Sequence, residues 1–100
     1  MLNYRSNPDG AAAVKAEAEA LGARVALAQG DVAEPDDIAS IYKVVDDTFG
    51  RLDVLINNAG IVDKSAKLTE MDHARLSRMM NVNVIGAMLV ATAAVLRMQA

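Results

Sequence analysis

The stretch LDVLINNAG, residues 52–60, carries the strongest signal for the fold of this chain. Its first half is apolar almost throughout rather than alternating, which is typical of a parallel strand covered on both faces. The apolar run stops at two adjacent amides, Asn57 and Asn58, which are followed by Ala59 and Gly60. In an open parallel sheet, ligands bind beyond the carboxyl ends of the strands. The stretch therefore predicts a buried strand that runs to Asn57 and ends at a binding edge.

Two further apolar stretches complete the predicted sheet. Residues 1–4 form one, and Arg24–Gln29 forms the other, which ends at Gly30 and Asp31. Between and after the three strands, helical patterns run over residues 8–21, 35–49 and 70–80, with a last helical run to about residue 98 that follows or continues from the third. This alternation predicts an α/β fold, a parallel sheet with helices on its faces, in a single domain over residues 1–100.

Capping residues set the expected ends of two helices. Asn7 is placed to cap a helix with Pro8 at its first position, and Gly22 supplies a left-handed stop. Thr69 followed by Asp72 has the spacing of a capping box, which predicts that the third helix begins near Glu70.

Composition excludes several classes of function. Hydrophobic residues make up 53% and charged residues 23%, and the net charge of −3 leaves no basic surface for nucleic acid or anionic membranes. The chain has no cysteine, which excludes disulfides and thiolate metal sites and fits a cytoplasmic location. The longest apolar stretch, Val84–Leu96, is shorter than the roughly 20 residues of a membrane helix. The only histidine, His73, lies among polar residues, so no metal site is expected.

Three motifs resemble those of a known family. GDV at residues 30–32, GRLDVLINNAG at residues 50–60 and MMNVNVIGAM at residues 79–88 are similar to successive motifs of the short-chain dehydrogenase/reductase family. The resemblance covers essentially the whole chain. It implies a partial Rossmann-like, doubly wound sheet of three strands with flanking helices, in which the first strand and the C-terminal part of the family fold are missing.

The resemblance also implies roles at the end of the 52–57 strand. Asn57 and Asn58 are expected to tie neighbouring strands together, with Asn58 shaping the cofactor site. An amide has donors and an acceptor, so it can bridge backbone groups where parallel strands diverge. Ala59 and Gly60 lack bulk, which allows the backbone to approach the nucleotide ribose. The alternative is that these residues only form a turn.

Two further positions match the family's motifs. The Asp31 carboxylate is expected near the adenine amino group, with the Val32 backbone N–H on a ring nitrogen; the alternative for Asp31 is a cap on its own loop. Asn83 resembles the family's catalytic asparagine, whose implied role is to hold a water by interrupting regular helix bonding, and Asn81 is the competing candidate. Gly86 is expected to permit close packing of the helix.

The first strand end indicates the cofactor. An NAD site places an acid there for the ribose 2′-hydroxyl, whereas an NADP site offers an arginine to the 2′-phosphate. Tyr4, Arg5 and Ser6 occupy this end, and no acid precedes Asp9. A guanidinium binds phosphate in bidentate fashion. The sequence therefore favours NADP(H) over NAD(H), with Arg5 and Ser6 as cofactor-binding residues; the alternative for Arg5 is a solvated surface charge.

The family's chemistry needs a Tyr-x-x-x-Lys motif, a serine and a glycine-rich turn, and the chain holds none of them. Its only tyrosines, Tyr4 and Tyr42, are followed four residues later by Pro8 and Asp46. We therefore expect a fragment of an NADP-dependent oxidoreductase that acts on a carbonyl or alcohol, inactive by itself. The alternative is a non-catalytic module that acts only in association; a methyltransferase does not account for the motifs. The sequence does not specify the substrate.

Two structural expectations follow from what the chain holds. From Val84 to Leu96 only Gly86 and Thr92 are not hydrophobic, so more than one helix face is apolar and must be covered. The resemblance implies a homo-oligomer through this helix; the alternative is cover by a C-terminal segment of the same chain. In the sheet, residues 1–4 either pair directly with the 52–57 strand or leave a gap one strand wide.

Overall fold

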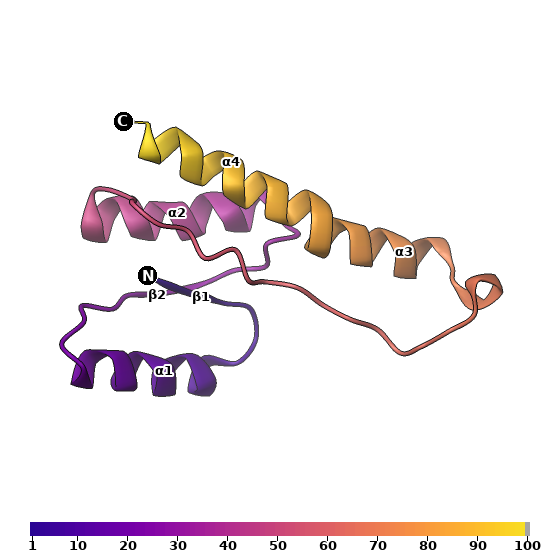
Figure 1. Ribbon diagram of the computed structural model, residues 1–100, viewed down its shortest axis with the longest axis horizontal. Helices are drawn as coiled ribbons and strands as arrows, with labels where there is room; N and C mark the ends of the chain where they lie inside the picture. Colours follow the sequence, from indigo (N-terminus) through magenta and orange to yellow (C-terminus); the bar gives the residue numbers. More distant parts are fainter. Residues whose placement is uncertain (100) are drawn as a thin grey trace.

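The structure, a computed structural model that describes residues 1–99, places helices on two sides of a short parallel sheet (Figure 1). Helix α1 lies on one side of the strands, and α2 and α4 lie on the other. Helices α3 and α4 form one continuous rod through the stretch η2. The elements are β1 (Leu2–Tyr4), α1 (Pro8–Ala20), β2 (Leu27–Gln29), α2 (Pro35–Phe49), η1 (Leu68–Glu70), α3 (His73–Met80), η2 (Asn81–Gly86) and α4 (Ala87–Met98).

Strands β1 and β2 pair in parallel and are joined by α1. The register places Leu2 opposite Leu27 and Tyr4 opposite Gln29. The Asn7 side chain caps α1 as predicted, because its Oδ1 accepts from the Gly10 N–H at 3.0 Å. The predicted α/β class and the parallel pairing of the first two strands are therefore confirmed.

The prediction of a third strand is wrong. Residues 52–57 form no strand, and no backbone hydrogen bond joins them to another backbone group within residues 1–99. Val54 and Ile56, expected to be buried on both faces, are 70% and 81% exposed. The physical reason is that a single strand has no stability without a neighbour to satisfy its donors and acceptors. Of the two arrangements expected from the sequence, the described residues show the open gap.

The core lies between α2, α4 and the segment that follows α2. Its buried members are Val32, Ile38, Tyr42, Val45, Val82, Val90 and Ala94, and Leu52, Leu55 and Ile61 pack against them. Helix α2 ends at Gly50, whose φ of 72° is the left-handed conformation that favours glycine. By contrast, α1 buries no residue completely, so the larger part of the apolar packing holds α2 against α4.

Polar contacts reinforce the packing of α2 against α4. The Tyr42 hydroxyl donates to the Val90 carbonyl at 2.7 Å, and burial raises the pKa of Tyr42 although the positive charge of Arg97 opposes this. The Arg97 guanidinium lies over the Tyr42 ring, 4.5 Å from its centroid, and bonds both carboxylate oxygens of Asp46 at 2.8 Å. That bidentate contact lowers the pKa of Asp46.

Helix α3 begins later than the capping box predicts. Residues 68–70 form a separate 3-10 turn, and the N-cap is Asp72, whose Oδ1 accepts from the Arg75 N–H at 2.8 Å. Thr69 therefore does not cap this helix. Asp72 caps the helix in place of Thr69, because its short carboxylate reaches the backbone N–H of Arg75, three residues further along the chain.

The continuous helix His73–Met98 has 26 residues and is long and apolar enough to cross a membrane, by length and composition alone. The sequence-based expectation considered only its most apolar part and so placed it below this length. One such helix is weak evidence for a membrane span, because the core helix of a soluble protein passes the same test.

Candidate functional site

A cleft of about 220 Å³ lies at the ends of β1 and β2 and brings together most of the predicted cofactor-binding residues. Arg5, Asp31, Val32, Ala59 and Gly60 all line it. Its remaining walls come from Asn3, Tyr4, Gly30, Ile61 and Val82. Residues from three separate segments thus meet at one edge, as the carboxyl ends of parallel strands require.

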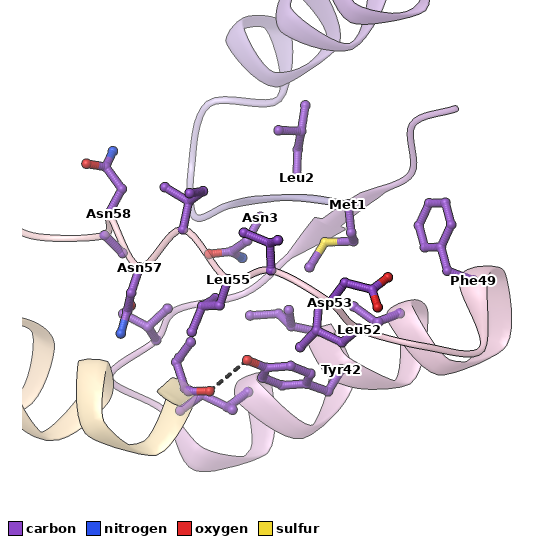
Figure 2. Close-up of a pocket in the computed structure, with 18 of the residues that line it drawn as sticks. Met1, Leu2, Asn3, Tyr42, Phe49, Leu52, Asp53, Leu55, Asn57 and Asn58 are labelled. Atoms are coloured by element: carbon purple, nitrogen blue, oxygen red, sulfur yellow. Dashed lines mark hydrogen bonds between the residues drawn. The ribbon is translucent and has the colours of Figure 1, made fainter. Parts of the chain in front are cut away.

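Two predicted cofactor-binding residues do not line this cleft. Ser6 is exposed in the turn before α1. Asn58 lines a second, larger cavity (Figure 2), which shares Asn3, Val32 and Ala59 with this cleft. The structure therefore groups Arg5 with Asp31 and sets Ser6 and Asn58 apart from them.

Asn3, which the sequence analysis did not single out, fixes the end of β2. Its Nδ2 donates to the Ala28 carbonyl at 3.1 Å and to the Gly30 carbonyl at 3.2 Å. These bonds hold the backbone just before Asp31 against β1. The signal in the sequence was a single amide inside an otherwise apolar strand, because such an amide can bond the backbone of a neighbouring strand.

The two carboxylate oxygens of Asp31 have different partners. Its Oδ1 accepts from the Ala33 N–H at 2.9 Å, and its own N–H donates to Asp37 Oδ2 at 2.9 Å. Its Oδ2 lies 3.9 Å from Arg5 Nη1, in an ion pair whose arginine side chain is 49% exposed. The loop-capping alternative is thus present in the structure, but it uses only one carboxylate oxygen.

Val32 presents an available donor beside Asp31. Its side chain is buried, and its backbone N–H has no hydrogen-bond partner in the part of the chain that the structure describes. The backbone carbonyl of Val32 packs directly on Gly86. A Cβ added at Gly86 would overlap the Val32 carbonyl oxygen and would lie 2.8 Å from the Asn81 carbonyl oxygen. Gly86 therefore permits the close approach that the sequence predicted.

Asn83 holds the loop that closes the cleft. Its Oδ1 accepts from the Ile61 N–H at 2.8 Å, and its Nδ2 donates to the Ile61 carbonyl at 2.8 Å. It lies in the π-helical stretch η2, so the predicted interruption of regular helix bonding is present. Asn81, the competing candidate, has an exposed side chain with no hydrogen bond within residues 1–99.

Asn57 ties its segment to a helix rather than to a strand. Its Nδ2 donates to the Ala87 carbonyl at 2.9 Å, at the start of α4. Within the described residues no strand lies beside Asn57, so they do not show the implied role of joining neighbouring strands. The Asn57 amide instead holds its segment to the start of α4.

Among the described residues, no group of three or more His, Cys, Asp or Glu side chains is placed to hold a metal. His73 begins α3, and its nearest polar neighbour is the Ser77 hydroxyl at 3.4 Å from both ring nitrogens. The polar groups that line the cleft include the carboxylate of Asp31, the guanidinium of Arg5 and the backbone N–H of Val32.

The whole chain, residues 1–100, matches the family described as short chain dehydrogenase. The chain therefore belongs to the short-chain dehydrogenase family. It is 36% identical over 97 residues to L-rhamnose 1-dehydrogenase (NAD(P)(+)) of a Sphingomonas species, covering 97% of this chain and 38% of that protein. It is 34% identical over 82 residues to 3beta-hydroxysteroid dehydrogenase 2 of Eggerthella lenta, covering 82% of this chain and 32% of that protein.

Solved structures of the family have the same fold over the matched region. A short chain dehydrogenase from Burkholderia cenocepacia, in complex with NADP, is 34% identical with a TM-score of 0.87, covering 95% of this chain and 38% of that chain. A Serratia marcescens short-chain dehydrogenase/reductase variant is 28% identical with a TM-score of 0.90, covering 96% of this chain and 39% of that chain. The chain thus spans about two fifths of the length of these neighbours, and its family favours an oxidoreductase over a non-catalytic module.

Proposed function

We propose that this chain is the nucleotide-binding segment of an oxidoreductase that transfers a hydride between NADP(H) and a carbonyl or alcohol substrate. The observation that carries the choice of NADP(H) is Arg5, which lines the cleft at the end of β1 with no acid before Asp9. A half-exposed guanidinium beside a cleft suits a 2′-phosphate. The NADP bound to the Burkholderia neighbour and the NAD(P)(+) in the name of the Sphingomonas relative support it.

The proposed roles follow the geometry of the cleft. Arg5 takes the 2′-phosphate; Asp31, through the oxygen that does not cap its loop, accepts from the adenine amino group; and the Val32 N–H donates to a ring nitrogen. Ala59 and Gly60 let the ribose approach the backbone. Ser6 and Asn58 lie outside the cleft, so we propose for them only supporting contacts at its two ends.

Asn83 is proposed as the catalytic asparagine, acting from behind the cleft. We also propose that residues 1–100 alone transfer no hydride, because they hold no Tyr-x-x-x-Lys motif. The proposed enzyme is cytoplasmic.

Replacing Arg5 with alanine in the complete enzyme should raise the Michaelis constant for NADPH about tenfold or more and leave that for NADH nearly unchanged. A charge-assisted hydrogen bond contributes about 1.5–3 kcal/mol, and the lower end applies to a half-exposed side chain. Steady-state kinetics with each cofactor measure this. The matched control is Arg24→Ala, since Arg24 lies away from the cleft on the Phe49 ring. Equal losses with both cofactors would contradict the assignment.

The exposed face of α4 and η2 is proposed as an assembly surface between copies of the complete protein. Only Val90 and Ala94 of α4 are buried, whereas Met88 and Leu96 are 66% and 64% exposed. An apolar face of this kind is typical of an interface.

We expect Met88→Glu to dissociate the complete protein into smaller species, because a carboxylate cannot be buried there without a partner. Sedimentation velocity at micromolar concentration measures the change. Leu21→Glu is the matched control, since Leu21 is 89% exposed at the far end of α1. A wild-type protein that sediments as a monomer would exclude the interface.

A further inference from the structure

The loop that leads away from the cleft, residues 61–67, has little apolar packing to hold it in place. It begins at Ile61, which lines the cleft, and it reaches η1 without forming a helix or a strand. In Figure 1 the loop runs outward from the sheet to η1, and α3 returns from there toward the core. Val62 is 93% exposed, and only Ile61 and Ala66 in this range are partly covered. Polar contacts must therefore fix the position of this loop.

Arg75 of α3 contacts two successive residues of the loop. Its Nε lies 3.3 Å from Asp63 Oδ2, and its Nη2 donates to the Lys64 carbonyl. Asp63 Oδ1 accepts from the Lys64 N–H at 2.8 Å, so both oxygens of this carboxylate have partners. The Arg75 side chain is only 22% exposed, and its backbone N–H is held by the Asp72 cap. The guanidinium is therefore well placed to anchor the loop on α3.

Asn83 is a second anchor for the same loop, because it bonds both backbone groups of Ile61. Arg75 and Asn83 belong to one continuous rod (Figure 1), and their separation in sequence corresponds to about 12 Å along a helix axis. The chain from Ile61 to Lys64, fully extended, reaches about 10 Å. The stretch between the two anchors therefore has little slack.

We propose that Arg75 is a positioning residue, which keeps Ile61 bonded to Asn83 by holding Asp63 and Lys64 at the far end of this stretch. Because the stretch has little slack, loss of the Arg75 contacts gives Ile61 freedom to leave Asn83. The Asn83 bonds are neutral, whereas the Arg75 anchor includes a charge pair that is partly open to water, so salt weakens it. Where the inference concerns turnover, it rests on the proposed function, since it acts through the proposed catalytic asparagine.

Replacing Arg75 with alanine in the complete protein should speed hydrogen exchange at the Ile61 amide about threefold, less than the loss of Asn83 does. The change removes a partly exposed ion pair and one hydrogen bond, and alanine does not weaken the helix itself. The amides of α2 should keep their wild-type exchange, which separates release of the loop from global unfolding. Arg78→Ala, at an exposed arginine of the same helix, is the matched control. Unchanged Ile61 exchange in Arg75→Ala, or an equal change in Arg78→Ala, would overturn the proposal.

The Asp63→Asn variant tests whether the ion pair is part of the anchor. An asparagine keeps an acceptor for the Lys64 N–H but removes the charge opposite Arg75. Ile61 exchange in the double variant should be no faster than in Arg75→Ala, because both changes remove the same contact. Salt raised from about 0.1 M to 1 M should speed Ile61 exchange about twofold in the wild type and leave Arg75→Ala unchanged, relative to the amides of α2. Additive effects of the two substitutions would contradict the anchor.

Steady-state kinetics of Arg75→Ala separate this inference from the proposed function. With Asn83 as the catalytic asparagine, we expect kcat to fall as Ile61 exchange rises, while the Michaelis constant for NADPH stays near the wild-type value because Arg5 is untouched. Faster exchange with unchanged kcat would support the anchor and contradict the catalytic role of Asn83. Unchanged exchange would overturn the anchor whatever the turnover.

Discussion

Replacing Gly86 with alanine is expected to destabilise the protein, against the normal sign of this substitution. Inside a helix, alanine is usually more stable than glycine by about 0.5–1 kcal/mol. Here the added Cβ overlaps the Val32 carbonyl oxygen and lies 3.0 Å from the Val32 carbonyl carbon and 2.8 Å from the Asn81 carbonyl oxygen. Because all three are backbone atoms, none can move aside as the end of a side chain can. Overpacking of this kind costs about 1–3 kcal/mol, and we expect the upper end.

Urea unfolding followed by circular dichroism measures the loss of stability. Gly60→Ala is the graded control, because its Cβ would meet only the end of the Asn83 side chain, at 3.2 Å. We expect the Gly60 variant to lose clearly less than the Gly86 variant. If Gly86→Ala matches or exceeds the stability of the wild type, the close packing of η2 on the Asp31–Val32 turn is wrong.

Local signals in the sequence predicted the helices and their order well. The Asn7 cap, the left-handed Gly22 after α1 and the interruption around Asn83 all depend on contacts within a few residues or on a backbone conformation that one residue type favours. Such features can be read from spacing alone. The capping box at Thr69 failed because Asp72 offered a competing cap of equal reach.

The strand at residues 52–57 failed for a different reason. An apolar run shows that a segment is suited to a buried strand, but a strand exists only when a neighbour satisfies its backbone. Nothing within LDVLIN specifies whether that neighbour is present. The same reasoning explains Asn57, whose amide bonds the Ala87 carbonyl where a strand was expected.

Most of the candidate cleft could be predicted from the sequence because strand ends converge at one sheet edge. Arg5, the pair Asp31–Val32 and the pair Ala59–Gly60 come together there from three segments that are far apart in the sequence. The bonds that hold the cleft in shape could not be predicted. Asn3 reaches the Gly30 carbonyl across 27 residues and Asn83 reaches Ile61 across 22, and no local pattern specifies such pairs.

Asn83 should be the residue whose loss most loosens the loop that closes the cleft. Alanine at this position removes the acceptor for the Ile61 N–H and the donor to the Ile61 carbonyl, both at 2.8 Å. Each bond contributes about 0.5–1.5 kcal/mol, so the loss of both should make the loop open about fivefold more often or more. Hydrogen exchange at the Ile61 amide reports this opening directly, and the proposed enzyme should lose turnover in parallel.

The aspartate variant separates the two bonds of Asn83. Asn83→Asp keeps an acceptor for the Ile61 N–H but sets a carboxylate oxygen against the Ile61 carbonyl oxygen, where a donor was. We therefore expect Ile61 exchange to rank wild type slowest, aspartate next and alanine fastest. Asn81→Ala is the matched control, since the exposed Asn81 side chain has no hydrogen bond within residues 1–99. If Asn81→Ala speeds Ile61 exchange as much as Asn83→Ala does, the effect comes from the helix interruption and the assignment to Asn83 fails.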